Sequence, residues 1–526
     1  MGFDGEFSTL VVIMKKKYIP YLMSAFLFLN VSCDDWLDVQ QDTEKRETEL
    51  FDNYQGFQGA LAGCYDDLAK QDLYGEKLTC SNIESMAGLW HMGSSADNLQ
   101  TNILPNYYFT THEYRHSVAE EEIRRIYLGL FNTILEANMI IKAAEEKGHV
   151  IPDAKSRAVV LGEAYAIRAY CQFDVLRLFG QVPQNPTIFV SLPYSEITTK
   201  DEMPHYYSYE QYIVKLENDL NKALSLLKEN DPVFDYTYDE FNNAGYNGYE
   251  MVRIEDSFMN YRQHRLNYWA VKALQARMYM YIGQKEKAHD LALEVILAKT
   301  RTGKPVALLS AAADYSNKYY ASPSESLFMV AKAGLIDETE DLLLGNEELV
   351  VREGEGLVIL PTSYESLFEG TNTGSDLRYL NMWAAVQTSQ STKYRSIRKH
   401  FYDPDKLGGE TKTKVLATKL ELIPLLRLSE MYLIAVEGAP TVAEANMLYT
   451  IYMGSKNVFL TSPFGSMDEV RSEMLKEYRR EFFAEGVVFY LYKRYGIENM
   501  WSKENVTVTE TDYILPLPRT EYNPNN

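Results

Sequence analysis

The sequence predicts a mainly α-helical protein in which paired helices form an α/α superhelical scaffold that carries long irregular loops. One observation is that apolar residues recur with the period of a helix in many segments. The second is that Gly-, Asn- and Tyr-rich stretches at 88–118, 229–260, 300–330 and 338–415 are too long for simple connectors and are typical of functional or disordered loops. The helical segments lie at about Gly56–Lys70, Ala119–Lys147, Ala154–Phe179, Tyr209–Lys228, Tyr261–Gly283, Lys285–Lys299, Glu421–Glu437, Ala443–Gly454 and Met467–Tyr495.

The N-terminus has the pattern of an export signal. The basic run Lys15–Lys17 precedes a short, largely apolar run at Tyr18–Leu29, which is too short for a transmembrane helix. We therefore expect residues 1–32 to be an export signal. Because Asp4 and Glu6 fit a signal poorly, we also expect translation to begin at Met14.

Cys33 follows this signal and resembles the lipidated cysteine of bacterial lipoproteins. The match departs at Asn30, where leucine is usual, so an ordinary secretory signal with an incidental cysteine is the alternative. Lipid chains on Cys33 would anchor the protein, since each buried methylene contributes about 0.8 kcal/mol. The acidic pair Asp34 and Asp35 resembles the surface-export tag of Bacteroidetes lipoproteins. Residues 33–50 would then be a tether.

Composition excludes some classes of protein. The chain has 52 Lys and Arg against 74 Asp and Glu, a net charge of −22, and a protein this acidic repels nucleic acids. Its four cysteines are too few for a disulfide framework, and their spacing does not suggest a zinc knuckle. Cys171 lies on an apolar helical face and is expected to be buried.

The segment 273–296 has the character of a tetratricopeptide repeat. Tyr279, Gly283, Ala288, Ala292 and Val295 fall at the offsets of such a repeat, where small residues let two antiparallel helices approach closely. Similar helix pairs are expected at 123–179 and 421–454. Scaffolds of this kind usually bind partners.

Four further stretches together resemble the RagB/SusD family. In the first, Gly180 and Pro183 end a helix that carries Arg168. The resemblance implies a SusD-like fold over a single domain, 51–526, with an N-terminal part at 51–260 and a C-terminal part at 261–526. The stretches are "RAYCQFDVLRLFGQVP" (168–183), "IPLLRLSEMYLIAVEG" (423–438), "YRREFFAEGVVFYLYKRYG" (478–496) and the C-terminal "YILPLPRTEYNPNN".

Charged residues recur in these motifs within apolar helices that must pack. We interpret them as ion pairs that hold helices in register rather than as ligand contacts. They are Arg427, Glu430, Arg479, Arg480, Glu481 and Glu485.

Catalytic and metal-binding patterns are weak. "HEYRH" at 112–116 matches the zinc-peptidase pattern His-Glu-x-x-His, but the apolar helical period begins only near Ile123, so we expect a solvated loop. No catalytic residues and no metal ligands are expected. The resemblance implies no cofactor, except for a structural calcium ion that the sequence does not locate.

The resemblance implies a non-enzymatic, surface-exposed lipoprotein of the outer membrane. It would capture a glycan and deliver it to a SusC-like TonB-dependent barrel. Peptide cargo, a helical-repeat adaptor and, last, a zinc peptidase are the alternatives. Sugar rings stack on aromatic platforms flanked by polar side chains. In the loops that would supply such a platform, the candidate ligand-binding residues are Trp90, Asp97, Asn98, Tyr107, Tyr108, Tyr315, Tyr319 and Tyr320, with Trp383 as a further candidate.

Overall fold

The chain divides by its internal contacts into two units, Met1–Asp52 and Asn53–Asn526. The structure, a computed structural model, describes residues 49–92, 99–199, 201–242, 254–343, 350–351, 356–388, 393–400, 421–460, 464–501 and 507–522. Cys33, the export signal and most of the tether lie outside these residues. Among the helices in the described ranges, none is both long enough and apolar enough to cross a bilayer.

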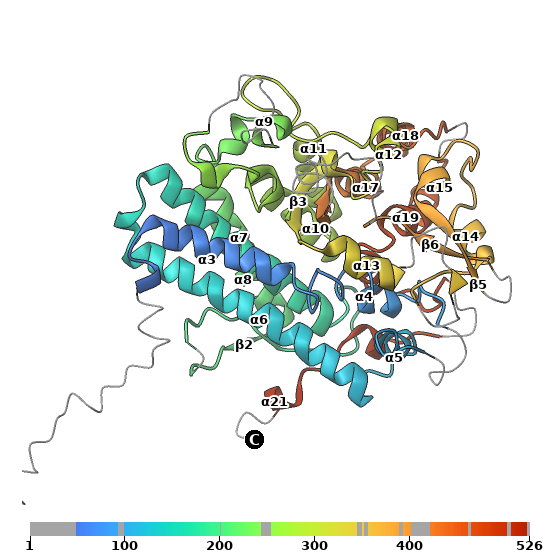
Figure 1. The fold of residues 1–526 in the computed structure, drawn as a ribbon, viewed down its shortest axis with the longest axis horizontal. Coiled ribbons are helices and arrows are strands. Elements are labelled where there is room, and N and C mark those ends of the chain that lie inside the picture. The colour runs from blue at the N-terminus through green and yellow to red at the C-terminus, as the bar shows by residue number, and fades with distance from the viewer. Residues whose placement is uncertain are drawn as a thin grey trace, which may run out of the picture. The chain divides into compact units, whose positions relative to one another are not determined.

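A row of helices, each packed on the next, forms the scaffold of the second unit (Figure 1). This confirms the prediction of a mainly α fold built from helix pairs. In order of packing, the row consists of α3 (Tyr54–Leu68), α6 (Ser117–Glu146), α7 (Ala154–Phe179), α8 (Tyr209–Leu227), α10 (Tyr268–Tyr281), α11 (Lys285–Ile296), α17 (Leu428–Gly438) and α18 (Val442–Ser455).

Local sequence determines where these helices begin and turn. The carboxylate of Asp153 accepts the backbone N–H groups of Lys155 and Ser156 at the start of α7, which satisfies two donors that have no partner within the helix. Gly283, with φ of +84°, makes the turn between α10 and α11. Ala288 is fully buried, so these helices pack closely, as the repeat pattern predicted.

The remaining elements, apart from α19, are short. The helices are α4 (Asn82–Met86), α5 (Leu104–Thr110), α9 (Tyr238–Asn242), α12 (Ala312–Ser316), α13 (Leu335–Leu343), α14 (Pro361–Leu367), α15 (Leu377–Asn381), α19 (Met467–Phe482), α20 (Val488–Tyr495) and α21 (Arg519–Tyr522). The 3-10 helices are η3 (Gly148–Val150), η4 (Pro232–Phe234), η5 (Ser257–Met259), η6 (Arg262–His264), η7 (Pro323–Glu325) and η9 (Glu510–Tyr513).

The strands in the described ranges form three small sheets. Strand β1 (Leu192–Pro193) pairs antiparallel with β2 (Tyr206–Tyr207), and β3 (Ser326–Ala331) pairs antiparallel with β7 (Leu422–Arg427). Strand β5 (Trp383–Thr388) lies between β4 (Val350–Val351), which is parallel to it, and β6 (Lys393–Ile397), which is antiparallel.

The prediction of one helix over Glu421–Glu437 is wrong in its first half. Residues 422–427 form β7, and every one of them is buried. A short continuous apolar run fits a buried strand as well as a helix, so periodicity could not separate the two. Pro424, which lacks the N–H that a helix interior needs, favours the strand.

The predicted helix Met467–Tyr495 is two helices, because the chain turns sharply at 483–487. Ala484 and Gly486 have positive φ angles of 63° and 71°. A Cβ atom on Gly486 would lie only 2.0 Å from the carbonyl oxygen of Leu78. The backbone N–H groups of Ala484 and Gly486 donate to the buried carboxyl of Glu84, at 3.1 and 2.9 Å, so α4 holds this turn. The helix predicted to begin at Tyr261 begins instead at Tyr268, after η6.

The family motifs contact one another in the structure. Nζ of Lys493, from the third motif, donates to the carbonyl oxygens of Arg177 and Gly180 at 2.8 and 2.6 Å. These carbonyls lie at the C-terminal end of α7, in the first motif, where the helix leaves acceptors without partners. The ammonium group therefore caps the helix that Gly180 ends.

The ion pairs predicted for the motifs are confirmed, with one exception. Arg427 is 2% exposed and contacts Glu485, Glu481 and Glu325 at 2.8–2.9 Å. Burial alone would raise the pKa of Glu481, but Lys456, Arg427 and Arg378 hold it well below its usual value. The other pairs are Glu430 with Arg277, Glu437 with Arg494, and Arg480 with Glu477, whereas Arg479 bonds to the hydroxyl of Tyr492.

Candidate functional site

A cavity of about 470 Å³ opens between α9, the segment 304–308 and the residues from α12 to η7. This volume is within the range of small-molecule sites, roughly 300–1,000 Å³. Both walls come from stretches that the sequence marked as overlong loops. The lining consists of Thr237, Tyr238, Glu240, Lys304, Pro305, Val306, Ala307, Leu308, Asp314, Tyr319, Pro323 and Ser324.

Backbone hydrogen bonds fix the segment 304–308. The N–H of Thr300 donates to the carbonyl of Lys304 at 2.8 Å, which closes a turn that contains Gly303 at φ of +83°. The N–H of Leu308 then donates to the carbonyl of Ser324 at 3.0 Å. The second bond ties the segment 304–308 to the η7 side of the cavity.

Glu240 is held on the α9 side. Its Oε2 accepts the backbone N–H and the hydroxyl of Thr237, at 2.7 and 2.9 Å. The pKa of Glu240 lies below its usual value because the Thr237 N–H donates to it, and Lys304 acts in the same direction. Glu240 is therefore an ionised carboxylate in a fixed position.

Asp314 and Tyr319 define the opposite side. Oδ2 of Asp314 accepts the N–H of Ala311 at 2.8 Å, and its carbonyl accepts the N–H of Tyr319 at 2.8 Å. Tyr319 is half-buried, and partial burial together with Asp314 raises its pKa. An aromatic ring and a carboxylate thus share one wall.

These groups suit a polyhydroxylated ligand. Tyr238 and Tyr319 offer aromatic surface, on which the apolar face of a sugar ring can stack. Within the part of the chain that the structure describes, Glu240 Oε1 and Asp314 Oδ1 accept no hydrogen bond, so each can accept from a ligand hydroxyl. Lys304 is exposed and can donate.

The other two tyrosines of this predicted group have structural surroundings. Tyr315 and Tyr320 are only 6% and 5% exposed, because the helical turn of α12 directs Tyr315 inward. Burial, opposed by nearby Lys456, raises the pKa of Tyr315 to about 12. Both tyrosines are therefore too deeply buried to offer surface for stacking, which corrects the prediction that they bind ligand.

Trp90 was also wrongly expected on the ligand platform. Its side chain is fully buried, its indole N–H donates to the carbonyl of Cys80 at 2.8 Å, and its ring packs edge-on against Phe483. Trp383 also packs edge-on against Phe483 and is buried. The prediction placed these large aromatic side chains at the surface because they belong to long loop stretches, but the structure places them in the hydrophobic core.

Tyr107 and Tyr108 form a separate aromatic surface on α5. Both are half-buried, and Tyr108 stacks on His116 with ring centroids 3.7 Å apart. Figure 1 shows α5 in the lower part of the view, far from α9 and α12 in the upper part. The predicted residues therefore do not form one site. Asp97 and Asn98 lie outside the described residues.

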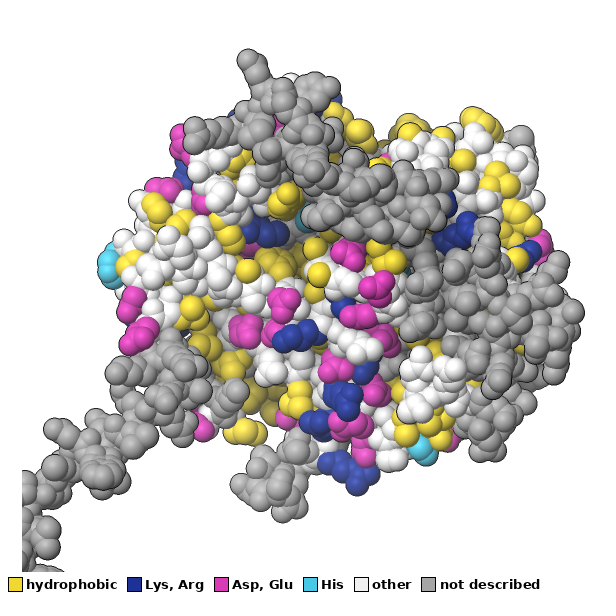
Figure 2. All heavy atoms as spheres, in the orientation of Figure 1, with side chains coloured by type: hydrophobic (Ala, Val, Ile, Leu, Met, Phe, Trp, Pro, Cys, Tyr) yellow, Lys and Arg dark blue, Asp and Glu magenta, His cyan; other side chains and the backbone are white. Residues whose placement is uncertain are grey.

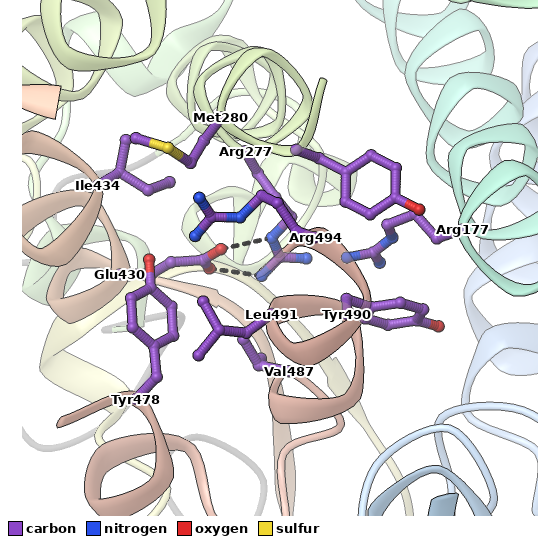
Figure 3. A pocket seen from close by; sticks show the side chains of 11 residues that line it. Arg177, Arg277, Met280, Glu430, Ile434, Tyr478, Val487, Tyr490, Leu491 and Arg494 are labelled. Atoms are coloured by element: carbon purple, nitrogen blue, oxygen red, sulfur yellow. Dashed lines mark hydrogen bonds and ion pairs between the residues drawn. The ribbon is translucent and has the colours of Figure 1, made fainter. Parts of the chain in front are cut away.

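A second, much smaller cavity of about 40 Å³ lies among buried charged side chains (Figure 3). Arg277 faces Glu430 there, and their Nε–Oε1 distance is 2.7 Å. Arg177 and Arg494 line the same space (Figure 3). It has room for water molecules but not for a sugar.

The zinc-peptidase alternative loses its structural basis. His112 lies in a turn with φ of +58°, and its Nε2 lies 3.1 Å from the carbonyl of Met86. His116 precedes α6 as its N-cap, so the two imidazoles do not share a helix face. Across the described ranges, no cluster of three His, Cys, Asp or Glu side chains could hold a metal ion.

Sequence reasoning missed most of the cavity lining. Tyr238, Glu240, Lys304 and Asp314 match no motif. The only signal for them was the length and composition of the stretches 229–260 and 300–330, which form the two walls.

Solved structures establish the fold. The chain is similar to a SusD superfamily protein from Bacteroides thetaiotaomicron VPI-5482, with a TM-score of 0.65 and 19% identity over 90% of this chain and 98% of that one. It is similar to surface glycan-binding protein A from Bacteroides uniformis, with a TM-score of 0.62 and 16% identity over 90% and 98% of the two chains. A laminarin-binding SusD-like protein gives a TM-score of 0.58 and 18% identity over 90% and 97%. The described part of the chain therefore has the SusD fold.

Sequence comparison agrees with the fold. Residues 35–246 match the family model SusD-like_3, described as "Starch-binding associating with outer membrane". No curated protein matches the chain. The N-terminal part of the chain is therefore similar to this family, in agreement with the SusD fold of the described residues.

Proposed function

We propose that this protein binds a glycan at the cell surface in the cavity beside Tyr319 and delivers it to a SusC-like TonB-dependent transporter. Cys33 would carry the lipid anchor in the outer membrane. The cargo would be bound and released without covalent chemistry, so the protein would not be an enzyme.

One observation carries the proposal: the cavity places Tyr319 and Asp314 opposite Glu240, and both carboxylates are held in position by their own hydrogen bonds. Groups held in place before the ligand arrives lose little conformational entropy on binding. A laminarin-binding protein of the same fold supports glycan as the cargo. Peptide is the second candidate, but it would need exposed backbone partners rather than aromatic surface.

Calorimetry with purified protein would test the proposal. The ligands would be soluble starch, laminarin and mannan, with a mixed-sequence tryptic peptide pool as the alternative cargo. The Tyr319→Ala variant should lose at least tenfold in affinity for the glycan that binds, since stacking area is removed. Tyr206→Ala is the matched control, because Tyr206 is 42% exposed and lies on β2, which Figure 1 shows far from α9 and α12.

Two results would contradict the proposal. Binding of peptides but no glycan would favour the alternative cargo. Equal glycan affinity in the wild type and in Tyr319→Ala would place the site elsewhere. Delivery would be tested separately by co-purification with a SusC-like barrel.

A further inference from the structure

Two carboxylate oxygens of the cavity lining are available as acceptors, and its potential donors to a ligand are the ammonium group of Lys304 and the hydroxyls of Tyr238, Tyr319 and Ser324. Glu240 Oε1 and Asp314 Oδ1 are acceptors that no described residue uses. The hydroxyl of Thr237 already donates to Glu240, and that of Ser324 lies 3.5 Å from Asp314. A ligand must therefore bring donors to these two positions.

The charged side chains of the cavity lining also favour a ligand that donates hydrogen bonds and carries no negative charge. Glu240 and Asp314 carry two negative charges, and Lys304 carries the one positive charge of the lining, so its sum is −1. Glu240 stays ionised because Thr237 donates to it. The chain as a whole carries −22.

We infer that this cavity selects uncharged glycans and rejects those that carry carboxylate or sulfate groups. The inference rests on the proposed function and narrows its ligand class. A neutral sugar presents hydroxyl groups, each of which can donate to Glu240 or Asp314. A uronate carboxylate only accepts hydrogen bonds, so near these positions it would face another acceptor of the same charge.

Lys304 does not reverse this preference. Its ammonium group is exposed, and an exposed charge interacts weakly through water. It can also act as a hydrogen-bond donor to the ring or glycosidic oxygens of a neutral sugar, which need a donor. Lys304→Gln should therefore leave the discrimination against acidic glycans in place or increase it.

Matched ligands would test the inference. Soluble starch, laminarin and mannan would each be compared with the same polymer after selective oxidation of its C6 hydroxyls to carboxylates. The oxidised form of the glycan that binds should bind at least tenfold more weakly, which corresponds to about 1.4 kcal/mol. Measurement in about 0.5 M salt would remove the long-range effect of the net charge while leaving contacts in the cavity largely unscreened.

Charge-neutral variants assign the effect to the cavity. Glu240→Gln with Asp314→Asn keeps an acceptor oxygen at each position and should reduce the tenfold difference to less than threefold. Asp290→Asn with Glu146→Gln is the control, because both carboxylates are exposed and lie outside the cavity, and it should leave the difference unchanged. Circular dichroism would show that both double variants are folded.

The outcomes separate the inference from the proposed function. Equal or tighter binding of an oxidised glycan would overturn the inference while glycan binding stood. An unchanged difference in the cavity variant, or its disappearance in high salt, would assign the effect to overall charge and also overturn the inference. If no glycan bound in either form, the proposed function would fail, and this inference with it.

Discussion

Replacing Arg427 by methionine should strongly destabilise the protein. The guanidinium is 2% exposed and donates through Nε, Nη1 and Nη2 to Glu485, Glu325 and Glu481 at 2.8–2.9 Å. Removing it leaves three buried carboxylates with fewer cations, and breaking a buried ion pair in this way costs about 3–5 kcal/mol. Lys456 and Lys399 remain in contact with these carboxylates. We therefore expect the free energy of unfolding to fall by about 4 kcal/mol, which is less than the summed contributions of the individual Arg427 ion pairs.

Urea denaturation followed by tryptophan fluorescence would measure this loss. The buried Trp90 and Trp383 pack against Phe483, two residues from Glu481 and Glu485, so their emission reports on this region. Arg124→Met is the control, because Arg124 and Glu121 form a pair that is nearly half exposed on α6, and it should cost less than about 0.5 kcal/mol. A loss below about 1 kcal/mol for Arg427→Met would refute the view that this network holds the fold.

Three further outcomes are expected. Trp90→Phe should lower stability by about 1–3 kcal/mol in urea denaturation, because the Cys80 carbonyl loses its donor, while glycan affinity stays unchanged; a loss of affinity would restore Trp90 to the site. In thermal denaturation, Gly486→Ala should lower stability several times more than Gly496→Ala. Both glycines have a positive φ, but only a Cβ atom at position 486 would clash with backbone, at the carbonyl of Leu78. Equal losses of stability would disprove this close approach of the two backbones. Burial raises the pKa of Glu84 to about 8, against the effect of two backbone N–H donors, so folding favours the protonated form of this carboxyl. The stability that this group contributes should therefore fall as the pH rises from about 5 to 8. Glu84→Gln should flatten this dependence of stability on pH, and an unchanged dependence would contradict the assignment.

The fold was predictable because its strongest signals are local and periodic. The segment Ala154–Phe179 was located to the residue, since Asp153 caps its start and Gly180 ends it. The network around Arg427 was also predictable, because charged residues within apolar helices must find partners. β7 was not predicted, since a fully buried strand has no alternation to distinguish it.

The candidate site was predicted only in part, for a physical reason. A loop sequence does not reveal which aromatic ring faces solvent, and Trp90 and Tyr315 turned inward while Tyr319 faces the cavity. Surface charge does not indicate the position of the site either, since acidic and basic side chains are intermixed on the face shown in Figure 2. Glu240 and Asp314 belong to segments more than 70 residues apart, and only the fold brings them together.

The most direct test of the central claim is a structure of the protein with its tightest-binding oligosaccharide. The account predicts a sugar ring stacked on Tyr319, with hydroxyl groups donating to Glu240 Oε1 or Asp314 Oδ1. An oligosaccharide bound elsewhere, for example on Tyr107 and Tyr108, with the cavity beside Tyr319 containing only water, would contradict it.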